Sequence, residues 1–181
     1  MRAYHVVCDR PLQVGQTIRF DEQNHSGVYQ RVMALADTAA DVLANPEEYP
    51  LPLEHHLDVA IRELAMEAVR REQYPEYPSR MACLYVSSEL EPARQWAQYF
   101  ARIGRPTYAV VEVEVDGRFF VGDALNCFDG TPDQADNLSR AERYWQNAPN
   151  EDSVQPIREM LVDGEITVLR VIEEFNANLP E

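Results

Sequence analysis

The order of its hydrophobic patterns is the feature that most constrains what this chain can fold into. Short apolar runs at 3–7 and 82–86 predict buried strands. Apolar residues recur at helical spacing over 28–44 and 53–71, and a third helix is expected over 89–103. The last third of the chain is predicted to form mainly strands. This order indicates an α+β fold, because a parallel α/β sheet would need strands and helices that alternate regularly.

Two Asp-Gly pairs predict β-hairpins. The segment 108–124 alternates apolar with polar residues on one side of Asp116-Gly117, and the segment 160–172 is divided by Asp163-Gly164. Asp-Gly favours the tight turn that joins antiparallel neighbours, type I′ in the first case. We therefore expect the strands on either side of each pair to be partners in one sheet.

Two Ser-x-x-Glu patterns predict helix starts. Ser88 with Glu91 and Ser139 with Glu142 fit the capping box, in which the serine caps the helix and the glutamate reaches back. Residues 10–26 show no period and are expected to be irregular.

Composition excludes several classes of function. All 16 basic residues are arginines, so Schiff-base chemistry, pyridoxal-phosphate attachment and the P-loop, which need a lysine, are excluded. No two of the 7 glycines stand two positions apart, so the GxG core of a Rossmann turn is missing. The net charge of -15 argues against general binding to nucleic acid or anionic membranes.

The chain is expected to form one domain over 1–181 and to be cytoplasmic. It has no apolar run of about 18 residues and no signal-like start. Cys8, Cys83 and Cys127 form no CxxC pair, which indicates reduced thiols. His5 and Cys8 are three apart on a strand, so we expect them to face opposite sides and the thiol not to be activated.

No metal site is predicted. Glu63 and Glu67 lie one turn apart on a predicted helix and are expected to form a solvated face. The acidic stretch 123–136 matches no EF-hand loop and is interpreted as a turn-rich loop. His55 and His56 are adjacent on a helix, so they point about 100° apart and cannot chelate one ion together.

Three strand-like segments each present one polar or aromatic residue. His5 lies within Ala-Tyr-His-Val-Val, Tyr85 lies within Ala-Cys-Leu-Tyr-Val-Ser, and Glu159 begins a late strand. In this order the segments resemble the ADP-ribosyltransferase superfamily in its His-Tyr-Glu branch, shared by poly(ADP-ribose) polymerases and diphtheria toxin. The resemblance covers about 3–172. Within the superfamily, the chain is similar to a bacterial branch with no assigned biochemical role.

The resemblance implies two small, mainly antiparallel sheets that form a central cleft with flanking helices and bind NAD as co-substrate. It implies that His5 hydrogen-bonds the adenosine ribose and the nicotinamide-side backbone of NAD. Tyr85 and one aromatic residue of the following helix, Trp96 or Tyr99, would enclose the nicotinamide ring. Aromatic faces suit a pyridinium ring because their quadrupole attracts cations.

Glu159 is the catalytic residue that the resemblance implies, acting with His5 and Tyr85. Its carboxylate would bind the 2′-hydroxyl of the nicotinamide ribose and stabilise the positive charge that develops as nicotinamide leaves. Ser87 joins the cofactor-binding residues, and Arg80 either binds the diphosphate or forms a structural salt bridge.

The alternative acidic residues, Glu112 and Glu114, form an ExE pattern. The arginine-directed branch of the superfamily uses such a pattern. Here the two glutamates lie in an alternating strand, and we expect them to face water.

The resemblance therefore implies an enzyme, similar to toxins or effectors, that transfers ADP-ribose from NAD to an undefined acceptor or hydrolyses NAD. The alternative is a module on the same fold that binds NAD or a protein without turnover. The acidic charge favours a protein or small-molecule acceptor over nucleic acid. The sequence leaves the acceptor and the oligomeric state open.

Overall fold

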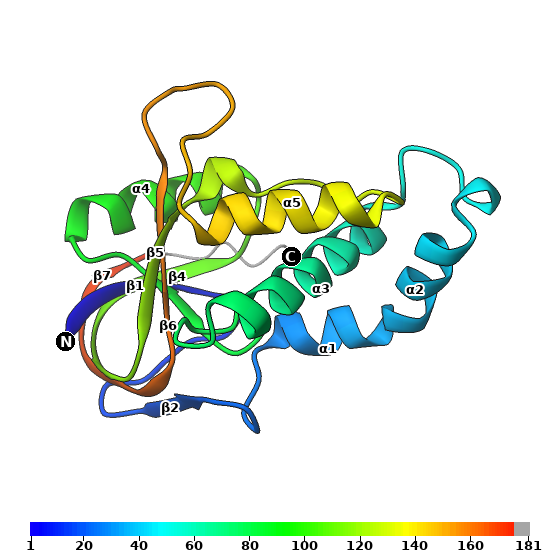
Figure 1. Ribbon diagram of the computed structural model, residues 1–181. Coiled ribbons are helices and arrows are strands. Elements are labelled where there is room, and N and C mark those ends of the chain that lie inside the picture. The colour runs from blue at the N-terminus through cyan, green and yellow to red at the C-terminus, as the bar shows by residue number, and fades with distance from the viewer. Residues whose placement is uncertain (176–181) are drawn as a thin grey trace, which may run out of the picture.

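The computed structural model describes residues 1–175 (Figure 1). Over these residues it is an α+β fold with two small antiparallel sheets and five α-helices. The predicted domain extends to residue 181, and its last six residues lie outside the described part. In chain order the elements are β1 (Arg2–Cys8), β2 (Thr17–Phe20), α1 (Gly27–Ala34), α2 (Ala36–Ala44), the 3-10 helix η1 (Pro46–Glu48), α3 (His55–Gln73), β3 (Leu84–Val86), α4 (Leu90–Arg102), β4 (Thr107–Asp116), β5 (Phe119–Asp123), the 3-10 helix η2 (Ala124–Asn126), α5 (Gln134–Trp145), β6 (Arg158–Val162) and β7 (Gly164–Glu174).

The two sheets meet at β1 and β3. One sheet has the order β1-β4-β7-β2 and the other β3-β6-β5, and all neighbours are antiparallel. Tyr4 and Ser87 exchange two backbone hydrogen bonds of 2.8 Å, which join the edge strands of the two sheets. The expectation of two small antiparallel sheets with flanking helices is confirmed.

The two Asp-Gly pairs do not form hairpins, so that prediction is wrong. The strand β4 pairs with β1 and β7, whereas β5 pairs with β6, so the strands flanking each Asp-Gly pair lie in different sheets. A Cβ on Gly117 would lie 2.0 Å from the carbonyl oxygen of Asp163, and one on Gly164 would lie 2.2 Å from that of Asp116. Gly164 also has a φ of 81°. The glycines permit a close approach where two chain segments cross from one sheet into the other.

The start of the chain differs from the predicted pattern in two places. The helix expected over 28–44 is divided into α1 and α2 at Leu35, which leaves the helical region with φ -111° and ψ 3°. The stretch 10–26, expected to be irregular, contains β2, an edge strand that pairs with β7. Only four residues long, β2 is too short to show a clear period.

Neither predicted capping box forms. The N-cap of α4 is Glu89, with no side-chain cap bond, although α4 itself matches the predicted helix closely. The N-cap of α5 is Asp133, whose carboxylate accepts hydrogen bonds from two first-turn amides, so Ser139 lies inside the helix. An aspartate caps a helix as well as a serine.

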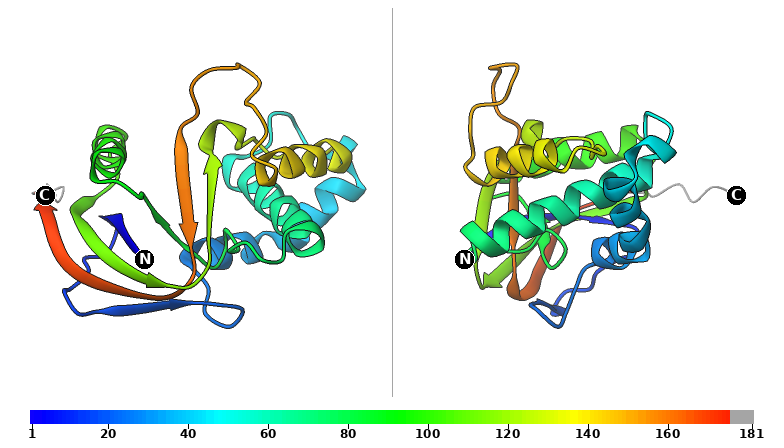
Figure 2. Two further views of the ribbon diagram at one scale, coloured as in Figure 1. Left: turned by 60° about the vertical axis from the view of Figure 1, so that its left-hand side comes forward. Right: turned by 45° about the vertical axis from the view of Figure 1, so that its right-hand side comes forward.

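Helix α4 packs on the four-stranded sheet, α3 and α5 pack on the three-stranded sheet, and an apolar cluster contains residues of both sheets. In Figure 2 (left) α4 lies on the concave face of the curved strands, while α3 and α5 are grouped beside β5 and β6. Val6 and Val110 pack under α4, and Phe120 and Leu161 pack against α3 and α5. Val111 belongs to the cluster that joins the sheets. Within residues 1–175, no helix has the length and apolar character needed to cross a membrane.

Candidate functional site

A cavity of about 630 Å³ lies where the two sheets meet. This volume is within the range of small-molecule and cofactor sites. Its walls come from β1, β3, β6, α1, α3 and α4. Six of the seven sequence-predicted site residues line it: His5, Arg80, Tyr85, Ser87, Trp96 and Glu159.

His5 is fixed on β1 as a neutral imidazole. Its Nδ1 lies 2.8 Å from the backbone oxygen of Tyr85 on β3. A carbonyl can only accept, so Nδ1 carries the proton and Nε2 is left as an acceptor. The pKa of His5 is lowered to about 4, mainly by burial; the hydrogen bond to Tyr85 opposes this shift and the nearby Arg105 adds to it.

Strand β3 places Tyr85 at the cavity, and Ser87 lines the cavity directly after the strand ends. The Tyr85 ring lies beside the guanidinium of Arg80, whose Cζ is 5.6 Å from the ring centroid. Burial raises the pKa of the Tyr85 hydroxyl well above its usual range, so it stays protonated. No residue within 1–175 hydrogen-bonds this hydroxyl, which leaves it available to a ligand.

Of the two aromatic candidates on α4, only Trp96 lines the cavity. It stacks on Phe100 with ring centroids 5.7 Å apart, and its Nε1 donates to the backbone oxygen of Arg158 at 3.3 Å. Tyr99 is 41% exposed and lies outside the cavity lining, so the structure does not bring it together with the other site residues. Its ring lies edge-on to the ring of Trp96, with centroids 5.8 Å apart.

Glu159 stands at the start of β6 with one carboxylate oxygen bound and one available. Its Oε1 accepts hydrogen bonds from Nη1 of Arg80 at 2.6 Å and from the hydroxyl of Tyr144 at 2.5 Å. Its Oε2 accepts no hydrogen bond from any residue of the described chain. The side chain is 11% exposed and lines the cavity, so Oε2 is the oxygen that a ligand could meet.

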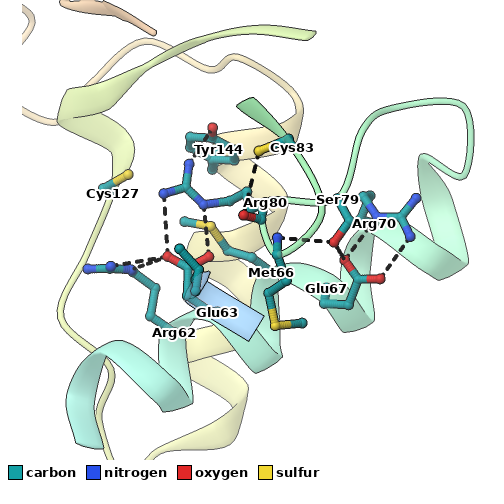
Figure 3. A network of polar contacts seen from close by, with 12 residues as sticks. Arg62, Glu63, Met66, Glu67, Arg70, Ser79, Arg80, Cys83, Cys127 and Tyr144 are labelled. Carbon is teal, nitrogen blue, oxygen red and sulfur yellow. Dashed lines mark hydrogen bonds and ion pairs between the residues drawn. The ribbon is translucent and has the colours of Figure 1, made fainter. Parts of the chain in front are cut away.

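Arg80 is the centre of a buried polar network (Figure 3). Its Nε donates to Glu63 at 2.9 Å and its Nη1 to Tyr144 at 2.6 Å, in addition to the bond with Glu159. Its Cζ lies 4.9 Å from the centroid of the Tyr144 ring. Of the two roles considered for Arg80, the structure shows the salt bridge, and this ties α3, α5 and β6 together.

Glu63 and Glu67 do not form a solvated face, so that expectation is wrong. Glu63 is 3% exposed and binds both Arg80 and Arg62, and Glu67 binds Arg70 among others (Figure 3). Burial alone would raise the pKa of Glu63, but the two arginines hold it below the usual range. A segment that carries Ser79 and Arg80 packs on this face of α3, a contact that helical period cannot reveal.

The alternative acidic pair lies away from the cavity. Glu114 is exposed as expected. Glu112 is 5% exposed, so the expectation that it faces water is wrong; it binds Arg170 at 2.6 Å across β4 and β7. Neither glutamate lines the cavity, which leaves Glu159 as its acidic residue on the strands.

The three cysteines are free thiols, and two of them, Cys8 and Cys83, line the cavity. Cys8 and His5 both belong to the lining, against the expectation that they face opposite sides, because the register between β1 and β4 shifts just before Cys8. Burial raises the pKa of Cys8 and raises that of Cys127 to about 11. Protonated thiols are poor nucleophiles, so the arrangement gives no support to cysteine catalysis.

Three further arginines line the cavity and were not anticipated from the sequence. Arg31, Arg62 and Arg105 join Arg80, whereas only Asp9 and Glu159 are acidic in the lining. The three come from different elements and share no local motif. Only the fold brings them together, so no sequence pattern could have identified them.

The family model for "Protein of unknown function (DUF2441)" matches residues 3–174 of this chain. The match therefore includes every residue of the cavity described above. No curated protein matches the sequence.

Proposed function

The chain belongs to the DUF2441 family, and we propose that it binds NAD in the cavity and breaks the bond between nicotinamide and ribose. ADP-ribose would pass to an acceptor or to water, as the resemblance to the His-Tyr-Glu branch of the ADP-ribosyltransferases implies. The observation that carries this proposal is the convergence of His5, Tyr85 and Glu159 on one cavity. They come from three strands that are far apart in sequence.

The neutral His5 and the two aromatic residues suit the two halves of NAD. The Nε2 acceptor of His5 matches a ribose hydroxyl donor. The rings of Tyr85 and Trp96 offer apolar faces to the flat nicotinamide, whose positive charge in NAD favours an aromatic face. Nothing in this arrangement needs a Rossmann turn.

Glu159 would stabilise the transition state through Oε2. When the bond between C1′ and the nicotinamide nitrogen breaks, its electron pair leaves with nicotinamide, which becomes neutral. Positive charge then develops at C1′ until the lone pair of the acceptor attacks and the acceptor loses its proton. A fixed carboxylate beside this centre lowers the barrier, and Arg80 and Tyr144 hold it in place through Oε1.

The test is nicotinamide release from NAD by the wild-type protein and by Glu159→Gln. The amide keeps the shape of the side chain but lacks the charge, so release should fall about 100-fold or more with the fold intact. Glu114→Gln is the matched control, since Glu114 is exposed on a strand outside the cavity. Equal release by wild type and Glu159→Gln would contradict the assignment of Glu159.

A second candidate function, NAD binding without turnover, is favoured by one contact. The guanidinium of Arg80 lies 2.6 Å from Glu159 and offsets part of the negative charge that catalysis would use. Calorimetry separates the two functions: NAD uptake with no nicotinamide release, with any acceptor, supports the binding module. For the transferase, the net charge of -15 favours a protein or small-molecule acceptor over nucleic acid.

A further inference from the structure

The cavity is cationic although the protein is strongly acidic. The chain has a net charge of -15, yet four arginines and only two acidic residues line this cavity. A cavity with low-dielectric walls concentrates the field of its charges, so this lining attracts anions. The ligand that fits it is therefore expected to carry negative charge.

Three of the four arginines are already bound to protein groups. Arg80 and Arg62 share Glu63, with donor-acceptor distances of 2.9 and 3.1 Å. Arg105 donates from Nε and Nη2 to one oxygen of Asp9, at 3.2 and 2.7 Å. A ligand would have to compete with these carboxylates for each of the three guanidinium groups.

Arg31 is the arginine of the cavity that has no such partner. It lies on α1, is exposed, and makes no ion pair or side-chain hydrogen bond with any residue of 1–175. Its Nη1 lies 3.6 Å from the position that a Cβ on Gly27 would take, and Gly27 also lines the cavity. The guanidinium group thus lies at the cavity wall with its donors unused.

We propose that Arg31 binds a phosphate group of the ligand and that the cavity accepts nucleotides that carry a diphosphate. The planar guanidinium fork matches two oxygens of a phosphate. This inference rests on the proposed function and deepens it, because it names the residue that holds the diphosphate of NAD. It moves to Arg31 a role for which Arg80 was the sequence-based candidate.

The experiment measures binding of ADP, inorganic pyrophosphate and adenosine by calorimetry at low salt. The proteins are the wild type, Arg31→Gln and the control Arg102→Gln, which removes an equal charge from an exposed position outside the cavity. Arg31→Gln should weaken ADP and pyrophosphate binding about tenfold or more, because a hydrogen bond between charged groups is lost. Adenosine affinity and the Arg102→Gln protein should be unchanged. The salt dependence of ADP binding should also become shallower in Arg31→Gln.

Three results would overturn the inference: no binding of ADP or pyrophosphate by the wild type, wild-type affinity for ADP in Arg31→Gln, or an equal loss of adenosine affinity. Circular dichroism and the Tm of Arg31→Gln verify its fold. NAD binding and nicotinamide release are measured in parallel. Arg31-dependent ADP binding without NAD binding or turnover would leave this inference standing and reject the proposed function. If the wild type and Arg31→Gln cleave NAD and bind it with equal affinity, the proposed function stands and this inference is rejected.

Discussion

At the residue scale, Arg80 determines both the stability of the buried network and the orientation of the candidate catalytic carboxylate, Glu159. It is 6% exposed and has ionic partners in Glu63 and Glu159. A buried charge without a partner is costly, whereas a complete network is tolerated. The same side chain therefore links the packing of α3 and α5 to the orientation of Glu159.

Arg80→Ala is expected to lower the free energy of unfolding by about 3–5 kcal/mol, because Glu63 would remain buried without its main counter-charge. Urea denaturation measures this loss. Arg94→Ala is the control, since the ion pair of Arg94 with Glu173 is partly exposed and is expected to contribute far less than the buried network. Similar losses in both variants would show that the network is not the determinant we describe.

His5 is expected to make stability depend on pH between about 6.5 and about 4. Burial depresses the folded-state pKa from 6.5 to about 4, so in this interval the unfolded chain binds more protons than the folded one. Stability from the neutral imidazole is thus complete above pH 6.5 and is lost as the pH falls toward 4, by up to about 3 kcal/mol.

The measurement is the free energy of unfolding of wild type and His5→Gln from pH 7 to pH 4. The carboxylates titrate in both proteins, so the difference between the two curves isolates the histidine. That difference should shrink toward acid pH. A constant difference would mean that His5 titrates normally in the folded protein.

At the scale of secondary-structure elements, the crossing of β4–β5 with β6–β7 replaces the hairpins that the sequence predicts. Gly117 and Gly164 face the carbonyl oxygens of Asp163 and Asp116 at distances that no Cβ could occupy. Arg118 completes the crossing, because its backbone N donates to the Asp163 carboxylate at 2.9 Å. The two Asp-Gly pairs form one joint between the sheets.

Gly117→Ala is expected to destabilise the protein by more than about 2 kcal/mol, because the new Cβ would lie 2.0 Å from a backbone oxygen that cannot move freely. Gly27→Ala is the matched control: its Cβ would meet only the end of Arg31 at 3.6 Å, and alanine favours the helix, so stability should be unchanged or slightly higher. Thermal unfolding of both variants gives the comparison. A mild effect of Gly117→Ala would contradict the close crossing.

Elements whose structure depends on local periodicity could be predicted from the sequence. The strand that carries His5 and the long helix α3 follow from spacing alone, and both are confirmed within a few residues. The prediction of two hairpins is wrong because Asp-Gly specifies only a local backbone shape, whereas the pairing of strands depends on the whole sheet. The burial of Glu63 was missed because its partner Arg80 lies in a segment with no helical or strand period. The polar residues of the site could be proposed from three short motifs, but the arginines around them could not.

At the scale of the whole molecule, the candidate site lies at the junction of two sheets that share few direct contacts. The junction consists of the Tyr4–Ser87 bridge, the apolar cluster that contains Val111 and Val162, and the crossing at Gly117. A ligand in the cavity would contact β1 from one sheet and β3 and β6 from the other. Binding would therefore add a connection between the two halves of the fold.

This geometry predicts where a bound ligand stabilises the protein. A ligand that binds only the folded state adds about 2.7 kcal/mol of stability at a concentration one hundred times its Kd. If NAD occupies the cavity, amide hydrogen exchange should slow in β1, β3 and β6 together, because opening either sheet would first require release of the ligand. The helix α2 contributes no residue to the cavity and serves as the internal control. Exchange measured with and without NAD tests this. Protection confined to one sheet, or greater in α2 than in these strands, would mean that the dinucleotide binds elsewhere and does not bridge the sheets.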